Sequence, residues 1–449
     1  MPIPTDTCDT LVIGAGPAGS ACATQLARQG QRVMLVDQHD FPRDKVCGDG
    51  LIPDALRALQ RLGVLDVVLA QAQRVGHVAC IGPRGGRVDV PGNLAVLPRR
   101  ALDDILKRHS EAAGAQFVAP WRFESVLTDE GSGRVIGALF KTPAGPRSVH
   151  ARWTILATGA VPRALMAAGM CQRHTPSGVA LRGYVLNPAM VGRIQALEIF
   201  WHKRLRMGYG WVFPCPGGVF NVGVGLAHSH SQVSADGRRT MADVNLRQLF
   251  DIFTELHAPV RELIAGGQWT GELKGAPLRC SLEGAQLTRP GLLVTGEAAG
   301  STYAFSGEGI GKAMETGLMA ADALLADFQV RADNPLSNGP FAKTSAKTST
   351  KSAAEAFANP SAEPSNDAAR DAAIESHYRQ AVAQLKPRFD LYERANHVND
   401  YPWLADLLIW RARHSPRILK RMAGVLEETN NPGHLITLRG LTRLFLPLR

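Results

Sequence analysis

The N-terminal turn reads Gly14-Ala15-Gly16-Pro17-Ala18-Gly19, and it stands between an apolar run, Thr10–Ile13, and a segment with the apolar spacing of a helix, Pro17–Arg28. A glycine-rich turn in this context is typical of the phosphate-binding turn of a Rossmann βαβ unit. We expect Gly14 to make the tight turn, Gly16 to let a pyrophosphate approach the backbone, and Gly19 to let helix and strand pack closely. The free N–H groups at the helix start then face the phosphates.

An acidic residue follows at the distance that such a unit requires. Asp37 ends the second expected strand, Arg32–Asp37, about twenty residues beyond the turn. A carboxylate at this position accepts the ribose hydroxyls and disfavours a 2′-phosphate. The bound adenosine is therefore predicted to be of the FAD or NAD type.

A second glycine-rich segment distinguishes an FAD site from an NAD site. Gly296-Glu297-Ala298-Ala299-Gly300 follows the apolar run Gly291–Thr295, and Gly307–Ile310 opens a further helix. The Glu297 carboxylate can hold ribityl or ribose hydroxyls, and the second helix N-terminus can face the pyrophosphate or the flavin ring. A site for NAD alone has no need of this second half, so the sequence favours FAD.

The α/β pattern of the first segment reappears in the second, so the chain between them is expected to be inserted into one nucleotide-binding domain. The fold class is predicted to be α/β: a Rossmann-type FAD-binding domain with an interleaved α+β antiparallel-sheet domain for the substrate, followed by a C-terminal helical region. The expected divisions are a first FAD-binding part over residues 1–170, the substrate sheet over 171–285, a second FAD-binding part over 286–330, a disordered insertion over 331–370 and helices over 371–449.

Two regions near the C-terminus have unusual composition. Residues 331–370 are mostly small and polar, and they cannot bury enough surface to offset their chain entropy, so we expect disorder there. The tail Leu435–Arg449 is amphipathic and basic. It is interpreted either as a helix docked on its own domain or as a helix in contact with a membrane surface.

Composition and charge exclude several classes of protein. The formal net charge is +10, but the basic residues are scattered, which argues against nucleic acid as a partner. The seven cysteines include no C-x-x-C pair, which argues against disulfides and a structural metal site. No apolar leader or membrane-spanning stretch is apparent, so we expect a cytoplasmic protein, with a peripheral position at the membrane left open. The oligomeric state stays open as well.

Three motifs follow one another along the chain. The first is the N-terminal turn with Asp37, running into Phe41–Leu51. The second is Gly208-Tyr209-Gly210-Trp211-Val212-Phe213-Pro214, and the third joins Gly296–Gly300 to Ser306–Ile310. Together they resemble flavoproteins of the geranylgeranyl reductase type, within the p-hydroxybenzoate hydroxylase-like superfamily, whose Y-x-W-x-F-P signature the second motif matches.

The resemblance implies an FAD-dependent oxidoreductase that reduces carbon–carbon double bonds of a long apolar substrate, such as a prenyl or polyene chain. Tyr209 and Trp211 match positions that line the family's substrate cavity near the flavin. The cofactor-binding residues implied by the resemblance and its motifs are Gly14, Ala15, Gly16, Pro17, Ala18, Gly19, Asp37, Arg43, Cys47, Gly48, Arg99, Gly296, Glu297, Gly307, Gly309 and Ile310.

One departure from the superfamily bears on the reductant. Ala157-Thr158-Gly159 stands where aromatic hydroxylases usually carry an Asp-Gly pair, and in those relatives the pair bears on the handling of NAD(P)H and flavin. The electron donor is therefore left as either NAD(P)H or a ferredoxin-like protein. Glu297 stands where the superfamily often has aspartate, but a glutamate can still accept hydroxyls.

Reduction of an isolated alkene needs a hydride at one carbon and a proton at the other, in a site that excludes water. Tyr209 and Trp211 have i, i+2 spacing, so on a strand they face the same side. The Tyr209 hydroxyl could relay the proton; the alternative is that both rings are core residues. Cys47 could donate a proton or act as a redox partner; the alternative is a buried, inert thiol.

Two other activities also fit a flavin site. The first is an oxygen-using hydroxylase or halogenase, although Tyr209 stands where halogenases carry a tryptophan, and no lysine occurs between Leu65 and Gly86. The second is an electron-transfer flavoprotein dehydrogenase, although the chain has no ferredoxin-like cysteine cluster. The reductase is the favoured hypothesis.

Overall fold

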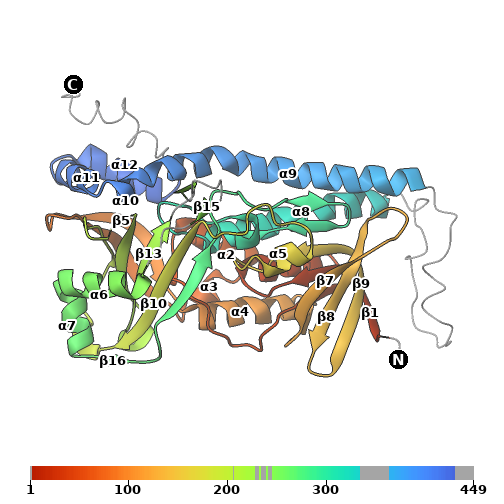
Figure 1. Ribbon diagram of the computed structural model, residues 1–449, viewed down its shortest axis with the longest axis horizontal. Helices are drawn as coiled ribbons and strands as arrows, with labels where there is room; N and C mark the ends of the chain where they lie inside the picture. The colour runs from red at the N-terminus through yellow and green to blue at the C-terminus, as the bar shows by residue number, and fades with distance from the viewer. Residues whose placement is uncertain are drawn as a thin grey trace.

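The computed structural model describes residues 3–205, 207–227, 232–233, 239–240, 245–333 and 364–429. Within these ranges the chain forms two large sheets, placed one after the other along the long axis of the molecule (Figure 1). Helix α9 (Pro364–Ala395) runs along that axis above both sheets (Figure 1). The predicted fold class, a Rossmann-type α/β domain with an interleaved antiparallel sheet and C-terminal helices, is confirmed.

The first sheet forms the dinucleotide-binding part. Five strands pair in parallel in the order β19-β9-β1-β2-β6, β18 joins β19 antiparallel, and a hairpin of β7 and β8 extends β9. The last four residues of β1 are buried, as expected for a parallel sheet covered on both faces. The bounds are β1 Thr5–Ile13, β2 Val33–Val36, β6 Gln116–Val118, β7 Arg122–Thr128, β8 Val135–Thr142, β9 Gly145–Leu156, β18 Thr288–Arg289 and β19 Leu292–Val294.

Helices cover this sheet, and the first of them lies where the sequence predicts. Helix α1 (Pro17–Arg28) has the predicted bounds, with Pro17 in its first turn, where the missing N–H costs nothing. Apolar residues of α1, α8 (Ile310–Asp333) and α9 share one core with β1 and β2. Helix α4 (Arg99–Ala112) begins at Arg99, one of the predicted cofactor residues. The remaining helices of this part are α2 Pro53–Leu62, α3 Leu65–Leu69, α5 Arg163–Ala167 and the short η3 Gly296–Ala299.

The second sheet is mainly antiparallel. Among the described residues its order is β16-β10-β13-β12-β11-β4-β5-β3, with β17 also on β10. The hairpin of β12 and β13 turns at the Pro- and Gly-rich segment Pro214–Gly218, through η2. The bounds are β3 Gly50–Leu51, β4 Gln73–Ile81, β5 Arg87–Val96, β10 Gly178–Leu186, β11 Leu197–Phe200, β12 Gly208–Pro214, β13 Val219–Ala227, β16 Gln268–Trp269 and β17 Lys274–Leu278. Two short helices, η1 (Pro188–Met190) and η2 (Pro216–Gly218), lie between strands. Strands β14 (Gln232–Val233) and β15 (Arg239–Thr240) form a separate pair.

The strand pairing corrects the predicted division at residue 170. Strands β3, β4 and β5 come from residues 50–96, inside the span assigned to the first FAD-binding part, yet they belong to the second sheet. Strand β4 pairs in parallel with β11, with Val78 opposite Leu197. Alternating apolar and polar residues indicate that the two strands of a hairpin pair with each other, but they do not indicate which distant strand the hairpin joins. The sequence alone therefore does not assign the hairpin of β4 and β5 to either sheet.

The helical regions differ from prediction at three places. The apolar spacing over Leu246–Leu263 predicts a single helix, but the segment forms two, α6 (Leu246–Leu256) and α7 (Ala258–Ala265). Pro259 lies in the first turn of α7 and cannot continue α6. Helix α8 extends to Asp333 and α9 begins at Pro364, so both ends of the predicted disordered segment 331–370 are helical. Residues 334–363 and the tail Leu435–Arg449 lie outside the described residues.

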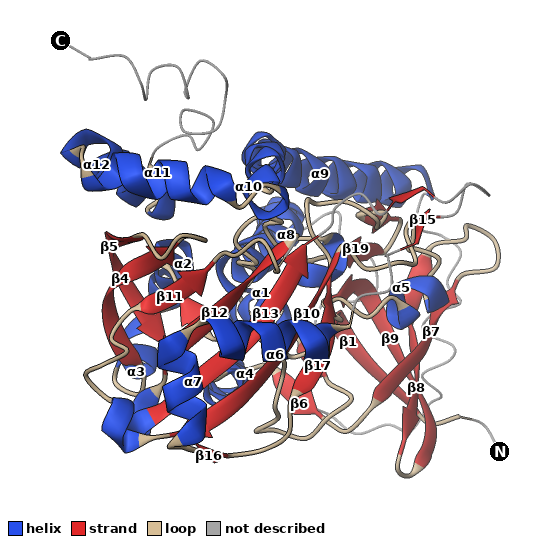
Figure 2. Cartoon of the chain, turned by 60° about the vertical axis from the view of Figure 1, so that its left-hand side comes forward, coloured by secondary structure: helices blue, strands red, loops and turns tan. Residues whose placement is uncertain are grey.

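The chain continues after α9 through α10 (His397–Asp400), α11 (Trp403–Arg413) and α12 (Pro416–Leu426). Figure 2 shows these three helices as an outer layer beyond β4, β5 and β11. None of the helices in the described part of the chain is long and apolar enough to cross a membrane.

Candidate functional site

The N-terminal turn has the geometry that its glycines predict. Gly14 adopts φ +103°, and a Cβ on it would lie 2.4 Å from the Ala157 carbonyl oxygen. A Cβ on Gly19 would lie 1.8 Å from the Gly14 oxygen, so only glycine lets α1 pack so closely on β1. A Cβ on Gly16 would meet only guanidinium groups, at 3.7 Å or more. The position next to Gly16 is therefore bordered by two guanidinium groups and not by protein backbone.

Asp37 lies at the end of β2 and faces this turn. Its carboxylate accepts hydrogen bonds from the backbone N–H of Ala15 at 2.9 Å and of His39 at 3.0 Å. Burial alone would raise the pKa of Asp37, but the hydrogen bonds from His39 and the nearby Arg43 outweigh it, so the pKa lies below its usual range. The carboxylate is charged at neutral pH, as an acceptor of ribose hydroxyls must be.

Two arginines converge above Gly16. A guanidinium nitrogen of Arg43 lies 3.7 Å, and one of Arg99 3.8 Å, from the position of a Gly16 Cβ. Both side chains are held by the buried carboxylate of Asp103, which contacts Arg99 at 2.6 Å and Arg43 at 3.1 Å. Two guanidinium groups beside an uncapped helix N-terminus form a site suited to a pyrophosphate. The sequence reasoning missed Asp103, although its i, i+4 spacing from Arg99 pointed to the pair.

The second glycine-rich segment packs directly on the first. A Cβ on Gly296 would lie 2.6 Å from the Ala18 Cβ, and one on Gly317 would lie 2.2 Å from the Ala18 oxygen. Gly296 begins η3 behind β19, and Ile310, which is buried, begins α8. The two predicted cofactor segments are thus brought to one place.

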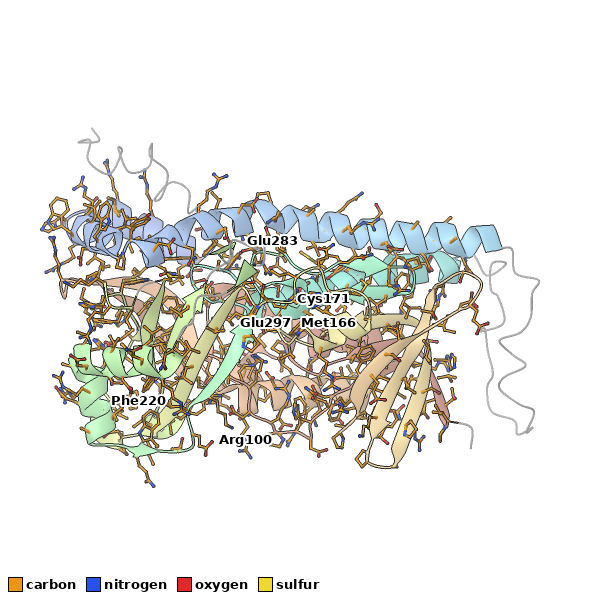
Figure 3. All side chains as sticks on the ribbon, in the orientation of Figure 1. Arg100, Met166, Cys171, Phe220, Glu283 and Glu297 are labelled. Carbon is orange, nitrogen blue, oxygen red and sulfur yellow. The ribbon has the colours of Figure 1, made fainter. Side chains whose placement is uncertain are left out.

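Glu297 lies near the middle of the long axis, between the strands of the two sheets (Figure 3). Its carboxylate lies 3.6 Å from the Lys45 ammonium and 3.5 Å from the Thr302 hydroxyl. Thr302 also faces Gly309, whose Cβ position is 2.6 Å from Thr302 Oγ1. Glu297 thus joins the loop after the first motif to the start of α8.

A buried hydroxyl without a hydrogen-bond partner lies beside the turn, in the segment that follows β9. Thr158, which stands where aromatic hydroxylases usually carry an aspartate, lies against Gly14. Its Oγ1 forms no hydrogen bond with any described residue. Buried hydroxyls normally have a partner. An orphaned hydroxyl, an open glycine and two convergent arginines together fit a bound dinucleotide, with Asp37 and Glu297 as acceptors for its hydroxyls.

An aromatic row borders this site, with three of its rings on β12 and the fourth directly after β11. We define it as Trp201, Tyr209, Trp211 and Phe213, whose successive ring centroids are 6.2, 6.3 and 6.5 Å apart. Tyr209 and Trp211 face the same side of the strand, as their spacing predicts. The Tyr209 hydroxyl donates to the Ser306 carbonyl at 2.5 Å and lies 2.8 Å from the Cβ position of Gly307.

The other end of the row meets the loop of Cys47 and Gly48. A Cβ on Gly48 would lie 3.1 Å from the Phe213 ring and 3.6 Å from Trp211 Nε1. Cys47 is half-buried, and its sulfur accepts the backbone N–H of Asp49 at 3.3 Å. Burial raises the pKa of the Cys47 thiol despite the nearby Arg99, so the thiol is protonated at neutral pH.

A buried polar network, which the sequence reasoning missed, fixes this loop to the second sheet. The Asp49 carboxylate accepts hydrogen bonds from the Tyr184 hydroxyl at 2.6 Å, the Asn221 amide at 2.7 Å and the Arg99 backbone N–H at 3.1 Å. Burial raises the pKa of Asp49 to about 6, and these hydrogen bonds limit the rise. Asp49 also has φ +65°, a conformation that is strained for a residue other than glycine.

Groups of acidic, histidine and cysteine side chains that could hold a metal ion are absent from the described ranges. Of the predicted cofactor residues, Asp37, Arg43 and Arg99 face the turn at Gly14–Gly19 from outside it. The others belong to that turn, to the loop at Cys47 and Gly48, or to the segment from Gly296 to Ile310.

Known proteins are similar to this chain in sequence and in fold. A family model described as an FAD binding domain matches residues 7–187. A menaquinone reductase of Mycolicibacterium smegmatis is 33% identical over 331 residues, which cover 70% of this chain and 76% of that protein. A digeranylgeranylglycerophospholipid reductase 1 of Methanopyrus kandleri is 28% identical over 321 residues, which cover 70% of this chain and 79% of that protein.

A solved structure shares the whole architecture. A geranylgeranyl bacteriochlorophyll reductase-like protein from Thermoplasma acidophilum matches with a TM-score of 0.65 at 19% identity, over 98% of this chain and 96% of that chain. At this identity the likeness concerns the fold alone.

Proposed function

This chain belongs to the family of geranylgeranyl reductase-type FAD-dependent oxidoreductases, and from this membership we propose that it reduces carbon–carbon double bonds in the isoprenoid chain of an apolar substrate. The mycobacterial relative is named for menaquinone and the archaeal relative for digeranylgeranylglycerophospholipid, and both of these molecules carry isoprenoid chains.

The observation that carries the proposal is the chemistry of the aromatic row. Its two polar atoms within reach of the site already have partners in the protein: the Tyr209 hydroxyl bonds to Ser306, and Trp211 Nε1 bonds to Asn221 Oδ1 at 2.9 Å. The row therefore offers ring faces rather than hydrogen bonds. A phenol substrate of a hydroxylase needs a polar partner for its oxygen, whereas an isoprenoid chain needs only apolar contact.

When bound, FAD supplies the hydride that adds to one alkene carbon. The chain must supply the proton for the other carbon and keep water away. Cys47 is the residue that we assign to hold this proton, because its thiol stays protonated at neutral pH and lies in the loop against Trp211 and Phe213. Tyr209 is a weaker candidate, since its hydroxyl proton is already donated to the Ser306 carbonyl oxygen. We assign Tyr209 and Trp211 to positioning the substrate.

The reductant is either NAD(P)H or a ferredoxin-like protein. Thr158 stands where hydroxylase relatives carry a carboxylate, which weakens the case for a nicotinamide. The two are separated by mixing the oxidised protein under argon with NADPH, NADH or a reduced ferredoxin and following the loss of the flavin absorbance. Fast bleaching by one of the nicotinamides identifies it as the donor.

The reaction itself is tested by reducing the flavin with dithionite under argon and adding an isoprenoid quinone or a geranylgeranyl lipid. We expect reoxidation of the flavin without oxygen, in proportion to the alkene added. Reoxidation only by oxygen, with faster turnover in the presence of a phenol, would instead identify a monooxygenase.

A further inference from the structure

Helix α11 has two apolar faces, and the described residues cover only one of them. Ala405, Ile409 and Ala412, at i, i+4 and i+7, are buried. They pack against β4, β5 and Trp201 in one apolar cluster that also touches Tyr209 and Phe305. The inner face of α11 therefore closes the apolar region beside the aromatic row.

The opposite face exposes large aromatic rings. Trp403 and Trp410 are separated by seven residues, so they share one side of the helix, and they are 60% and 53% exposed. Tyr401, which precedes the helix, is 56% exposed. We call these three residues the aromatic stripe. No other described part of the chain exposes three large aromatic side chains within ten residues. Tryptophan and tyrosine at this density are typical of surfaces at the boundary between water and lipid.

The charge around the stripe is positive. Between Tyr401 and Arg421 the sequence has five arginines and lysines and a single acid, Asp406. Asp406 turns away from the stripe, since its carboxylate accepts the backbone N–H of Arg84 at 3.1 Å. Arg413 and Lys420 are exposed. Aromatic rings flanked by basic side chains complement a bilayer with anionic headgroups.

The aromatic stripe lies on the outer side of a helix whose inner side borders the proposed substrate site. Helices α10 to α12 form the outer layer over the second sheet (Figure 2), so the stripe faces outward while the inner side of the same helix touches the site. A substrate with an isoprenoid chain is stored in lipid, and a protein that rests on the bilayer takes such a chain from lipid without exposing it to water.

We propose that the aromatic stripe docks this protein on a bilayer that carries anionic phospholipid. Docking on the bilayer does not depend on which reaction the flavin carries out. Its role in delivering an isoprenoid substrate rests on the proposed function. It is therefore tested by binding alone, so that a failure of the reductase assay and a failure of docking are distinguishable.

The test is co-sedimentation of the full-length flavoprotein with vesicles of phosphatidylglycerol and phosphatidylcholine, compared with vesicles of phosphatidylcholine alone. The double variant Trp403→Ser/Trp410→Ser should bind mixed vesicles about tenfold or more weakly, because each ring leaves the interface. Arg413→Gln/Lys420→Gln should reduce binding to mixed vesicles several-fold and have little effect with neutral ones. Val67→Ser/Val191→Ser, which alters exposed apolar residues elsewhere, is the matched control and should bind like the parent.

Flavin content and thermal unfolding verify that each variant is folded, and sedimentation velocity reports self-association. The proposal is overturned if the parent protein does not bind the mixed vesicles, or if the double tryptophan variant binds them as the parent does. It is also overturned if that variant turns a dimer into a monomer without loss of vesicle binding, because the stripe is then an interface between two copies of this chain.

Discussion

The side-chain amide of Asn221 lies 2.7 Å from Asp49 Oδ2 and joins the loop after the first cofactor motif to strand β13 of the second sheet. The same amide donates to the Cys47 carbonyl at 2.8 Å, and Asn221 Oδ1 accepts the indole N–H of Trp211 at 2.9 Å. One buried side chain thus fixes the thiol loop and the aromatic row relative to each other.

Removal of this side chain should be costly. Asn221→Ala leaves the Trp211 N–H and the Cys47 carbonyl without partners and takes one hydrogen bond from Asp49, so we expect the free energy of unfolding to fall by about 3 kcal/mol or more. Urea denaturation of the flavoprotein measures the change. Asn93→Ala, at an exposed position on β5, is the control and should change it by less than about 0.5 kcal/mol. Equal stability of the two variants would contradict the role given to Asn221.

The raised pKa of the Asp49 carboxyl predicts that the stability of the folded protein falls as the pH rises. Its pKa is raised by burial to about 6 in the folded protein, against about 4 in an unfolded chain. The folded state therefore binds the proton more tightly, and the stability contributed by this group is full below pH 4 and is lost as the pH rises to 6.

Comparison with Asp49→Asn isolates this effect, because the variant has no charge to titrate. The difference in unfolding free energy between the parent protein and Asp49→Asn should fall, by at most about 3 kcal/mol, as the pH rises from 4 to 6. Denaturation curves at several pH values measure it. A difference that stays constant or grows over this range would mean that the Asp49 pKa is not raised.

The Asp49 network also shows where sequence reasoning ends. The Rossmann turn and helix α1 were predictable because the glycines, Pro17 and the buried strand are neighbours in sequence and each has a local steric role. Asp49 and Asn221 are 172 residues apart, and their pairing follows from how the sheets pack. No periodicity or spacing encodes such a contact. For the same reason the hairpin of β4 and β5 was not assigned to the second sheet.

Two glycines in the N-terminal turn should respond differently to alanine. Gly14→Ala forces a Cβ to within 2.4 Å of the Ala157 oxygen at a positive φ, so we expect a loss of several kcal/mol of stability with or without FAD. Gly16→Ala meets nothing closer than 3.7 Å, so the apoprotein should unfold like the parent while its affinity for FAD falls about tenfold or more. Thermal unfolding and FAD titration separate the two effects. Parent-like FAD affinity in Gly16→Ala would place the pyrophosphate elsewhere.

We expect the Cys47 thiol to contribute to the rate of alkene reduction and not to the binding of FAD. Cys47→Ala should keep its flavin spectrum but slow the anaerobic reoxidation of reduced flavin by an isoprenoid about 100-fold, because the proton source is lost. Cys171→Ala changes another half-buried thiol, outside the site, and serves as the control. Stopped-flow absorbance under argon gives both rates. Reoxidation at the parent rate in Cys47→Ala would assign the proton to another group.

The most direct measurement is the mass of the product after one turnover. Protein reduced under argon is mixed with an isoprenoid substrate, and the extracted lipid is analysed by mass spectrometry, with a parallel sample exposed to air. We predict that the substrate gains two hydrogens per double bond reduced and that oxygen is not required. Unchanged lipid under argon, together with a product that has gained an oxygen atom in air, would contradict the reductase.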